Sequence, residues 1–419
     1  MSTRGIQGCS SLGLGLGLCV AASLLAACRG GTGTPAVNGA PAPVPNVVML
    51  VVDSGPGVAG GAVNHAYVTV NVCVSGSQTQ CANIDHVLLD TGSNGLRLVA
   101  SVLAAQKIAL SPLSDSAGNT LEECMSFVGG QTWGPVALAD VHLAGETAAK
   151  LPVQVMNDTS SGAPAPATCG ANGTLINGVS GFAANGVLGI GVFEQDCGQA
   201  CVAPATPLPL YFGCTAAGVC AAEKVALTDQ VTNPVALFAA DNNGVIVTLP
   251  NLQSANGDPT VQGTLVFGIA TQSDNPLPSS GITVLGTDTA GDFRTAYNGA
   301  ATGIPGLIDS GTDSYAFSDP TIAVCASGAF VGYYCPAVAP LSLSAVNTGV
   351  GANATTSTVD FALADPNSFV AGATAFIDLG GGGGSTTFTW GMPFFYGRAV
   401  YVGINQRTAG LYTGPYYAY

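Results

Sequence analysis

The stretch that decides the fold is GLIDSGTDS, Gly306–Ser314, in which an apolar run ends at Asp309 and small hydroxyl residues and a glycine follow. The same arrangement occurs upstream in HVLLDTGSNG, where Asp90 has equivalent neighbours. A third aspartate, Asp53 in MLVVDSGPG, is similar but lacks a hydroxyl residue at the third position after it. Asp309 is therefore either a turn residue or half of a carboxyl pair, with Asp90 and Asp53 as candidate partners.

Each of the two fuller motifs is followed later in the chain by an apolar stretch that contains glycine. NGVLGIG, residues 185–191, follows the first motif, and TWGMPFF, residues 389–395, follows the second. Two similar lobes, each contributing one aspartate, are the simplest account of this repeated pattern.

The composition favours β-structure. Only 8% of the 419 residues are charged and 58 are glycine, whereas helical proteins usually carry many charged residues on their solvent faces. Short runs of Val, Ile, Leu, Thr and aromatic residues alternate with turn residues, as in HAYVTVNVCV and GVIVTLP. The most helix-like segments are residues 101–110 and 220–231, and the five glycines at 380–384 are expected to form a mobile loop. The sequence predicts an all-β fold.

Charge and residue order exclude some classes of function. A net charge of −15 with nine Lys and Arg residues argues against nucleic acid as a partner. All three histidines (65, 86 and 142) lie in the first third of the chain, and no G-x-S-x-G occurs. The α/β-hydrolase order, with histidine last, is therefore impossible, and the spacing of the histidines does not suit a metal site.

The first 28 residues predict export. Arg4 precedes an apolar stretch that is short for a membrane span, and the stretch ends in LAAC at Cys28, which resembles a bacterial lipobox. Cleavage at an ordinary small-residue site is the alternative. The Gly/Pro/Ala-rich residues that follow are typical of a flexible tether. We expect a lipoprotein, anchored through Cys28 and facing the periplasm or the cell surface, with the outer membrane as the expected location.

The cysteines predict disulfides. Of 13 cysteines, three precede or form the lipidation site, which leaves ten in an exported chain. Close spacing pairs eight of them and elimination pairs the other two, although spacing alone leaves other connectivities open. A zinc site at the third and fourth pairs below is an alternative. The expected pairs are Cys73–Cys81, Cys124–Cys169, Cys197–Cys201, Cys214–Cys220 and Cys325–Cys335.

With these features in order along nearly the whole mature chain, the sequence resembles the pepsin-like aspartic peptidases. Besides the two aspartate motifs, HAYVTVNV is similar to that family's first substrate-side strand and residues 127–145 to its flap hairpin. GTLVFGI is similar to the opening of the second lobe, and residues 388–415 to the closing strands. In this order the strand HAYVTVNV precedes the first catalytic aspartate, so Asp90 is the expected partner of Asp309, and Asp53 is expected to lie in a turn.

The resemblance implies a bilobal fold with the aspartate pair at the floor of a cleft. Two carboxyl groups about 3 Å apart cannot both ionise, so they share one proton. The ionised group would act as general base for a water molecule while the protonated group polarises a peptide carbonyl. No cofactor or metal is needed for this chemistry.

The resemblance also assigns supporting roles within each motif. The first hydroxyl residue would brace the opposite loop. The glycine would let the backbone approach the carboxylate and offer it an N–H. The second hydroxyl residue would hydrogen-bond the outer carboxylate oxygen. The residues in these roles are Thr91 and Ser310, Gly92 and Gly311, and Ser93 and Thr312, in that order.

Two positions depart from the family's pattern. Phe127 stands where the flap usually has a tyrosine, beside Gly129 and Gly130 at the hairpin tip. Arg97 stands where many members have a tryptophan. Because those two side chains contact each other in the family, a joint change is coherent. Arg97 is expected either to contact an acidic group of a peptide or to lie in solvent.

Two functions are compatible with the sequence. The first is an aspartic endopeptidase that hydrolyses peptide bonds with a water activated by Asp90 and Asp309. The second is an inactive pepsin-like lipoprotein that binds a peptide, glycan or protein partner in its cleft. Retention of both aspartates with all four hydroxyl residues favours the enzyme, because a binding module has no chemical need for them.

The expected organisation is a signal peptide at 1–27, a tether at 28–46, an N-terminal β-lobe at 47–235 and a C-terminal β-lobe at 236–419. A monomer that acts on a peptide or protein substrate, with membrane contact only through the lipid anchor, completes the prediction.

Overall fold

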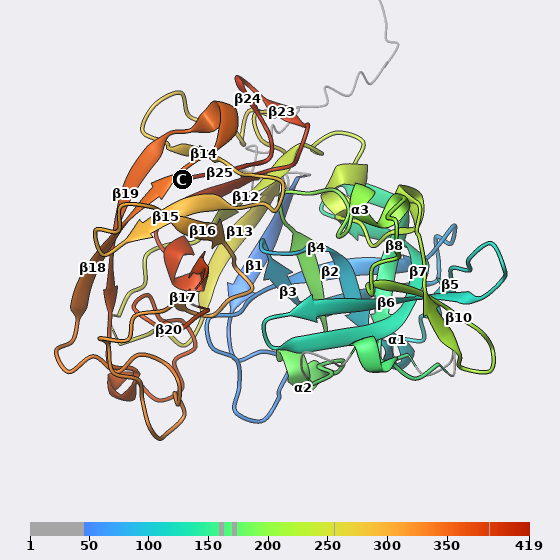
Figure 1. The fold of residues 1–419 in the computed structure, drawn as a ribbon, viewed down its shortest axis with the longest axis horizontal. Coiled ribbons are helices and arrows are strands. Elements are labelled where there is room, and N and C mark those ends of the chain that lie inside the picture. Colours follow the sequence, from blue (N-terminus) through green and yellow to red (C-terminus); the bar gives the residue numbers. More distant parts are fainter. Residues whose placement is uncertain (1–45, 159–162, 170–173, 255, 385) are drawn as a thin grey trace, which may run out of the picture. The chain divides into compact units, whose positions relative to one another are not determined.

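A computed structural model describes residues 46–158, 163–169, 174–254, 256–384 and 386–419, and these described residues form one compact unit (Figure 1). Strands and the loops between them dominate the described residues, so the all-β prediction is confirmed. The signal peptide, Cys28 and all of the tether but its last residue lie outside the described residues. Within the described part, no helix is long and apolar enough to cross a membrane.

The larger sheet runs through both halves of the chain, because β1 pairs with β2 on one side and β13 on the other. Its strand order is β11 (Cys220–Ala222), β10 (Tyr211–Cys214), β6 (Thr120–Phe127), β7 (Gly130–Leu143), β8 (Glu146–Met156), β4 (Asn94–Val99), β9 (Gly186–Ile190), β3 (Cys81–Asp90), β2 (Ala66–Val74), β1 (Val47–Val52), β13 (Val261–Phe267), β12 (Gly244–Thr248), β22 (Ala399–Gly403), β25 (Tyr416–Ala418) and β14 (Val284–Gly286), with β5 (Ser111–Pro112) beside β7.

The smaller sheet is built from the second half of the chain alone. Its order is β19 (Thr356–Leu363), β18 (Leu341–Thr348), β15 (Phe293–Tyr297), β16 (Ile304–Ile308), β21 (Phe388–Trp390), β17 (Tyr315–Phe317) and β20 (Gly380–Gly382). A separate pair is formed by β23 (Thr408–Ala409) and β24 (Tyr412–Thr413). The helices are short: α1 (Ala100–Ala105), α2 (Val179–Phe182) and α3 (Gln199–Val202), with 3-10 turns at Ala167–Cys169, Leu227–Asp229, Pro234–Leu237, Gly351–Asn353, Pro366–Ser368 and Met392–Phe395.

One three-strand arrangement occurs twice. In the first half, β9 lies between β3 and β4, parallel to β3 and antiparallel to β4. In the second half, β21 lies between β16 and β17, parallel to β16 and antiparallel to β17. All five residues of β9, GVLGI, are buried, as a continuous apolar run flanked on both sides by strands predicts. Each aspartate motif is the turn that joins the two outer strands.

Aromatic side chains pack around the three-strand arrangement in the second half of the chain. Trp390, on β21, is fully buried and packs against Phe361 and Phe388, at ring-centroid distances of 5.4 and 4.6 Å. Phe388 stacks on Phe317 of the neighbouring strand at 4.9 Å. The position of the Asp309 turn is therefore fixed by a cluster of large buried rings.

All five expected disulfides are present. The zinc alternative is wrong, because its four cysteines form the pairs Cys197–Cys201 and Cys214–Cys220. The one group of three potential metal ligands found among the described residues, Cys325, Cys335 and Asp365, includes a disulfide and so offers no thiolate.

Two local expectations are wrong. Residues 220–231 form β11 and a 3-10 turn rather than a helix, because the disulfide partners Cys214 and Cys220 face each other across the β10–β11 pair. The glycines at 380–384 are not a mobile loop: β20 is paired with β17, and a Cβ on Gly380 would lie 2.4 Å from Leu363 Cδ2. Glycine is needed at Gly383, where a Cβ would lie 2.6 Å from the backbone of Ala316 and Phe317. The helix expected at 101–110 is confirmed only over part of its length, by α1.

Candidate functional site

The two aspartates of the repeated motif lie against each other's loops. Asp90 is the last residue of β3 and Asp309 directly follows β16. A Cβ atom on Gly92 would lie 2.5 Å from Cγ of Asp309, and one on Gly311 would lie 2.8 Å from Cγ of Asp90. Glycine is therefore required at both positions for the two turns to approach this closely.

Each carboxyl group is held by its own turn. Oδ1 of Asp90 accepts hydrogen bonds from the N–H groups of Gly92 and Ser93 at 2.8 and 3.1 Å, and Oδ2 accepts from Oγ of Ser93 at 2.6 Å. Oδ1 of Asp309 accepts from the N–H of Gly311 at 2.8 Å. Its Oδ2 accepts from the hydroxyl three residues later in the same turn, Thr312 Oγ1, at 2.6 Å.

The two turns are joined by a reciprocal set of hydrogen bonds. Oγ1 of Thr91 donates to the carbonyl of Ile308 at 2.8 Å and accepts from the N–H of Ser310 at 3.0 Å. Oγ of Ser310 donates to the carbonyl of Leu89 at 2.7 Å and accepts from the N–H of Thr91 at 3.2 Å. Both hydroxyl groups are fully buried, so these bonds fix the aspartates relative to each other.

The inserted strands support the turns from behind. The N–H of Gly191, after β9, donates to the carbonyl of Ser93 at 2.8 Å. The N–H of Met392, after β21, donates to the carbonyl of Thr312 at 2.7 Å. The two apolar stretches singled out in the sequence therefore have matching positions behind the two turns.

The carboxyl pair retains a proton. Burial, followed by the charge of Asp309 and a hydrogen bond between the two carboxyl groups, raises the pKa of Asp90 to about 8. The hydrogen bonds from Ser93 and Gly92 oppose this shift without cancelling it. At neutral pH one carboxyl of the pair is therefore protonated, as expected for two adjacent carboxyl groups of which one is buried.

A β-hairpin formed by β6 and β7, which we call the flap, lies over the pair. Phe127 pairs with Gly130 at its tip, and Gly129 lies in the turn. The ring of Phe127 contacts that of Phe182 edge-on, with centroids 5.2 Å apart. A pocket of about 430 Å³ between the flap and the aspartates is lined mainly by apolar side chains, among them Leu88, Met125, Phe127, Ile176, Phe182 and Leu307.

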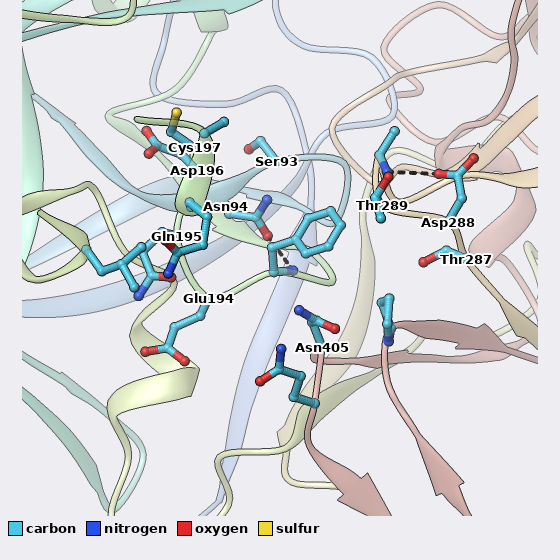
Figure 2. A pocket seen from close by; sticks show the side chains of 18 of the residues that line it. Ser93, Asn94, Glu194, Gln195, Asp196, Cys197, Thr287, Asp288, Thr289 and Asn405 are labelled. Atoms are coloured by element: carbon cyan, nitrogen blue, oxygen red, sulfur yellow. Dashed lines mark hydrogen bonds between the residues drawn. The ribbon is translucent and has the colours of Figure 1, made fainter. Parts of the chain in front are cut away.

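A second pocket, of about 940 Å³, meets the first at Gly92, Ser93 and Met125. Its lining is mixed, with polar side chains beside apolar ones such as Phe193 and Leu227. Figure 2 shows residues 194–197 on one side and residues 287–289 on the other, with Asn405 between them. The two pockets form a continuous groove. Both aspartates line its smaller, mainly apolar part, and its larger part has a mixed lining.

Arg97 is neither solvated nor placed to contact a peptide, so both expectations for it are wrong. Its side chain is fully buried, with 0% exposed, and its Nη2 forms ion pairs with Glu123 and Asp196 at 2.6 and 2.9 Å. The guanidinium carbon lies 5.7 Å from the centre of the Phe127 ring, so these two residues do contact each other.

The sequence did not identify two residues at the site. His65 lines the apolar pocket, and burial lowers the pKa of its imidazole, an effect that the charge of Asp313 partly opposes. Tyr417, near the C-terminus, is buried and its hydroxyl donates to the carbonyl of Thr91 at 3.3 Å. The position of His65 as the first residue of HAYVTVNV was the only local signal for either. Asp53 lies in a turn, as expected, accepting from the N–H of Gly55 at 2.9 Å.

Fold and site together define the chain as an all-β protein with a pair of aspartates, braced by hydroxyl groups, beneath a β-hairpin. Residues 42–419 match the profile of a family described as protein of unknown function (DUF3443), so the chain belongs to that family. A comparison with curated proteins found no match.

Proposed function

We propose that the protein is an aspartic endopeptidase in which Asp90 and Asp309 activate a water molecule. The observation that carries this proposal is the reciprocal contact of the two turns, in which the glycine of each motif lies against the aspartate of the other. A pair of carboxyl groups with a purely structural role has no need for an N–H donor and a hydroxyl donor at equivalent positions in both turns.

The chemistry follows from one shared proton. The ionised carboxylate accepts a proton from the water as its oxygen attacks the peptide carbonyl carbon, and the protonated carboxyl donates its proton to the carbonyl oxygen. One carboxyl then donates its proton to the amide nitrogen while the other carboxylate takes a proton from a hydroxyl of the tetrahedral intermediate. The C–N bond breaks to release an amine and a carboxylic acid, and the pair again holds one proton. Because that proton is required, activity is expected to fall as pH rises through about 8, the pKa of Asp90.

The groove supports a peptide as the substrate. Its smaller pocket, of about 430 Å³, contains the aspartate pair, and the adjoining pocket of about 940 Å³ offers further room for a chain that extends beyond the pair. The flap lies over the point where they meet, so it would cover the scissile bond and exclude water other than the attacking molecule.

We also propose a bilobal, pepsin-like arrangement of this all-β chain. The repeated three-strand unit around each aspartate supports it, as does the central position of β1, β13 and β12 between the two halves. A boundary near residue 235 stays a prediction.

Export as a lipoprotein on the periplasmic or outer surface is part of the same proposal. Five disulfides fit an oxidising compartment. We expect cells that express the full chain to incorporate labelled fatty acid into it, and the Cys28→Ala variant to incorporate none. Equal labelling of both chains would contradict lipidation at Cys28.

Peptidase activity is tested by incubating the domain that starts at residue 46 with a denatured protein mixture from about pH 3 to 9. We expect internal cleavage, blocked by a statine-type inhibitor whose hydroxyl replaces the attacking water between the two carboxyl groups. Absence of cleavage at every pH would contradict the proposal. If peptides then still bound the groove, the inactive binding protein would be the better account.

A further inference from the structure

A second group of buried ionisable side chains lies beside the flap. Arg97 comes from β4, Glu123 from the flap strand β6, and Asp196 from the loop after β9. All three side chains are 0% exposed. Tyr211, on β10, donates its hydroxyl to Oδ1 of Asp196 at 2.6 Å. No part of the proposed chemistry uses this group.

We propose that Arg97, together with the carboxyl pair Glu123–Asp196, is a positioning residue that holds the flap over the Asp90 turn. The inference rests on the proposed function, because flap position matters where a substrate is pressed against the aspartates. It also accounts for Phe127, a flap residue that has no hydroxyl group with which to form a hydrogen bond of its own.

The guanidinium contacts the turn and the flap at once. Nη1 of Arg97 donates to the carbonyl of Asn94 at 2.8 Å, and Asn94 directly follows the serine that hydrogen-bonds Asp90. Nη2 donates to Glu123, four residues before Phe127 on the same strand. The guanidinium carbon also lies 5.7 Å from the ring centre of Phe127. A planar, fixed arrangement of donors suits this bridging role, because it sets directions as well as distances.

The same guanidinium fixes one wall of the larger pocket, of about 940 Å³. Asp196, which accepts from Nη2 at 2.9 Å, lines that pocket with Gln195 and Cys197. Arg97 therefore links three parts of the candidate site: the Asp90 turn, the flap and the wall beside it.

Charge balance requires a proton in this cluster. Two carboxylates and one guanidinium would leave a net negative charge in a site with no exposure, which is costly. Glu123 and Asp196 both accept from Nη2 of Arg97, at 2.6 and 2.9 Å, so their carboxyl groups are adjacent, and a hydrogen bond between two carboxyl groups needs a proton. Among the described residues, no donor reaches Oε2 of Glu123, as expected if that proton fills the role.

The proton leaves as pH rises. Burial, followed by the charge of Glu123, raises the pKa of Asp196 well above its ordinary value, and Arg97 opposes this shift. The other ionisable group that faces the cluster is Tyr211, and the neighbour of Arg97 on β8 is the uncharged Gln154. Below the pKa the cluster is neutral. Above it, the buried charge is unbalanced and weakens the attachment of the flap.

The first test is hydrogen exchange of the backbone amides at 125–131, measured without substrate on the domain that starts at residue 46. Loss of the bridging geometry in Arg97→Lys is expected to speed flap exchange about tenfold or more. Arg398→Lys is the matched control, because Arg398 likewise lies over a phenylalanine ring, at 4.5 Å, and donates to a backbone carbonyl, at 2.7 Å, but lines neither pocket.

The second test uses Asp196→Asn, in which an amide supplies the hydrogen bond to Glu123 without a titrating proton. In the wild type, flap exchange corrected for its intrinsic rate is expected to rise as pH rises through the raised pKa of Asp196, and in this variant it should stay level. Asp196→Asn tests the role of the shared proton even if Arg97→Lys fails to fold. The amides of β9 serve as the internal reference.

Three results would overturn the proposal. The first is unchanged flap exchange in Arg97→Lys, and the second is the wild-type pH dependence in Asp196→Asn. The third is an equal rise in the exchange rates of the flap and of β9, which would indicate a merely structural role for the cluster. None of these measurements needs cleavage, so they stand even if the peptidase proposal fails. If cleavage is found, Arg97→Lys should raise KM far more than it lowers kcat.

Discussion

Replacing either aspartate of the pair by asparagine is expected to lower kcat/KM for peptide cleavage by at least about a thousandfold, because each carboxyl acts as both proton donor and acceptor within one cycle. Asparagine has the same shape and keeps an oxygen for the N–H donors of its turn, while its NH2 group can donate to the hydroxyl oxygen on the other side. The loss should therefore come from the chemical step, because the fold is preserved. The measurement is peptide hydrolysis by Asp90→Asn and Asp309→Asn.

Asp53→Asn is the matched control for this pair. Asp53 sits in a similar sequence, but its carboxylate accepts from the N–H of Gly55 in a turn, a role that an amide oxygen fills equally well. We expect its activity to be unchanged. Wild-type cleavage by either of the two dyad variants would exclude the proposed mechanism.

The pH dependence of unfolding gives an independent test of the same carboxyl. The pKa of Asp90 is raised from 3.8 to about 8, so the folded protein keeps a proton that the unfolded chain releases above about pH 4. This contribution to the free energy of unfolding is fully present below about pH 4 and is lost as pH rises through 8. The stability advantage of the wild type over Asp90→Asn should therefore shrink across this range in urea titrations. A constant difference would contradict the raised pKa.

The parts of the site that the sequence predicted are those determined by residue type at fixed offsets. Within each motif, the glycine and the two hydroxyl residues lie one to three positions from the aspartate, and a tight turn brings such neighbours together whatever the rest of the chain does. The disulfides were predictable for a similar reason, since four of the five link cysteines no more than 10 residues apart.

The parts that escaped prediction depend on distant residues. Arg97 is buried because its two carboxylate partners lie 26 and 99 residues away, and no local pattern indicates them. An arginine without such partners would lie in solvent, which is the usual outcome. The glycines at 380–382 form a strand because β17, some 65 residues earlier, offers its edge. In both cases tertiary contacts override the local preference.

The second large effect is expected from adding one methyl group at Gly92. Its Cβ would lie 2.5 Å from Cγ and within 2.9 Å of both carboxylate oxygens of Asp309, so the two turns must separate. A shift of about 1 Å between catalytic groups costs on the order of a hundredfold in rate. We expect Gly92→Ala to lower kcat/KM by at least about this factor, although both aspartates and all four hydroxyl residues remain.

Gly178→Ala is the control, because a Cβ there would meet no atom within 4 Å and the backbone φ of −110° accepts any residue. The measurement pairs peptide hydrolysis with the affinity of a statine-type inhibitor, which needs both carboxyl groups at the correct separation. If the contact between the turns creates the site, Gly92→Ala should lose affinity and activity together while Gly178→Ala loses neither. Full activity in Gly92→Ala would mean that the close approach of the two turns is unnecessary, and the aspartate pair would then need another explanation.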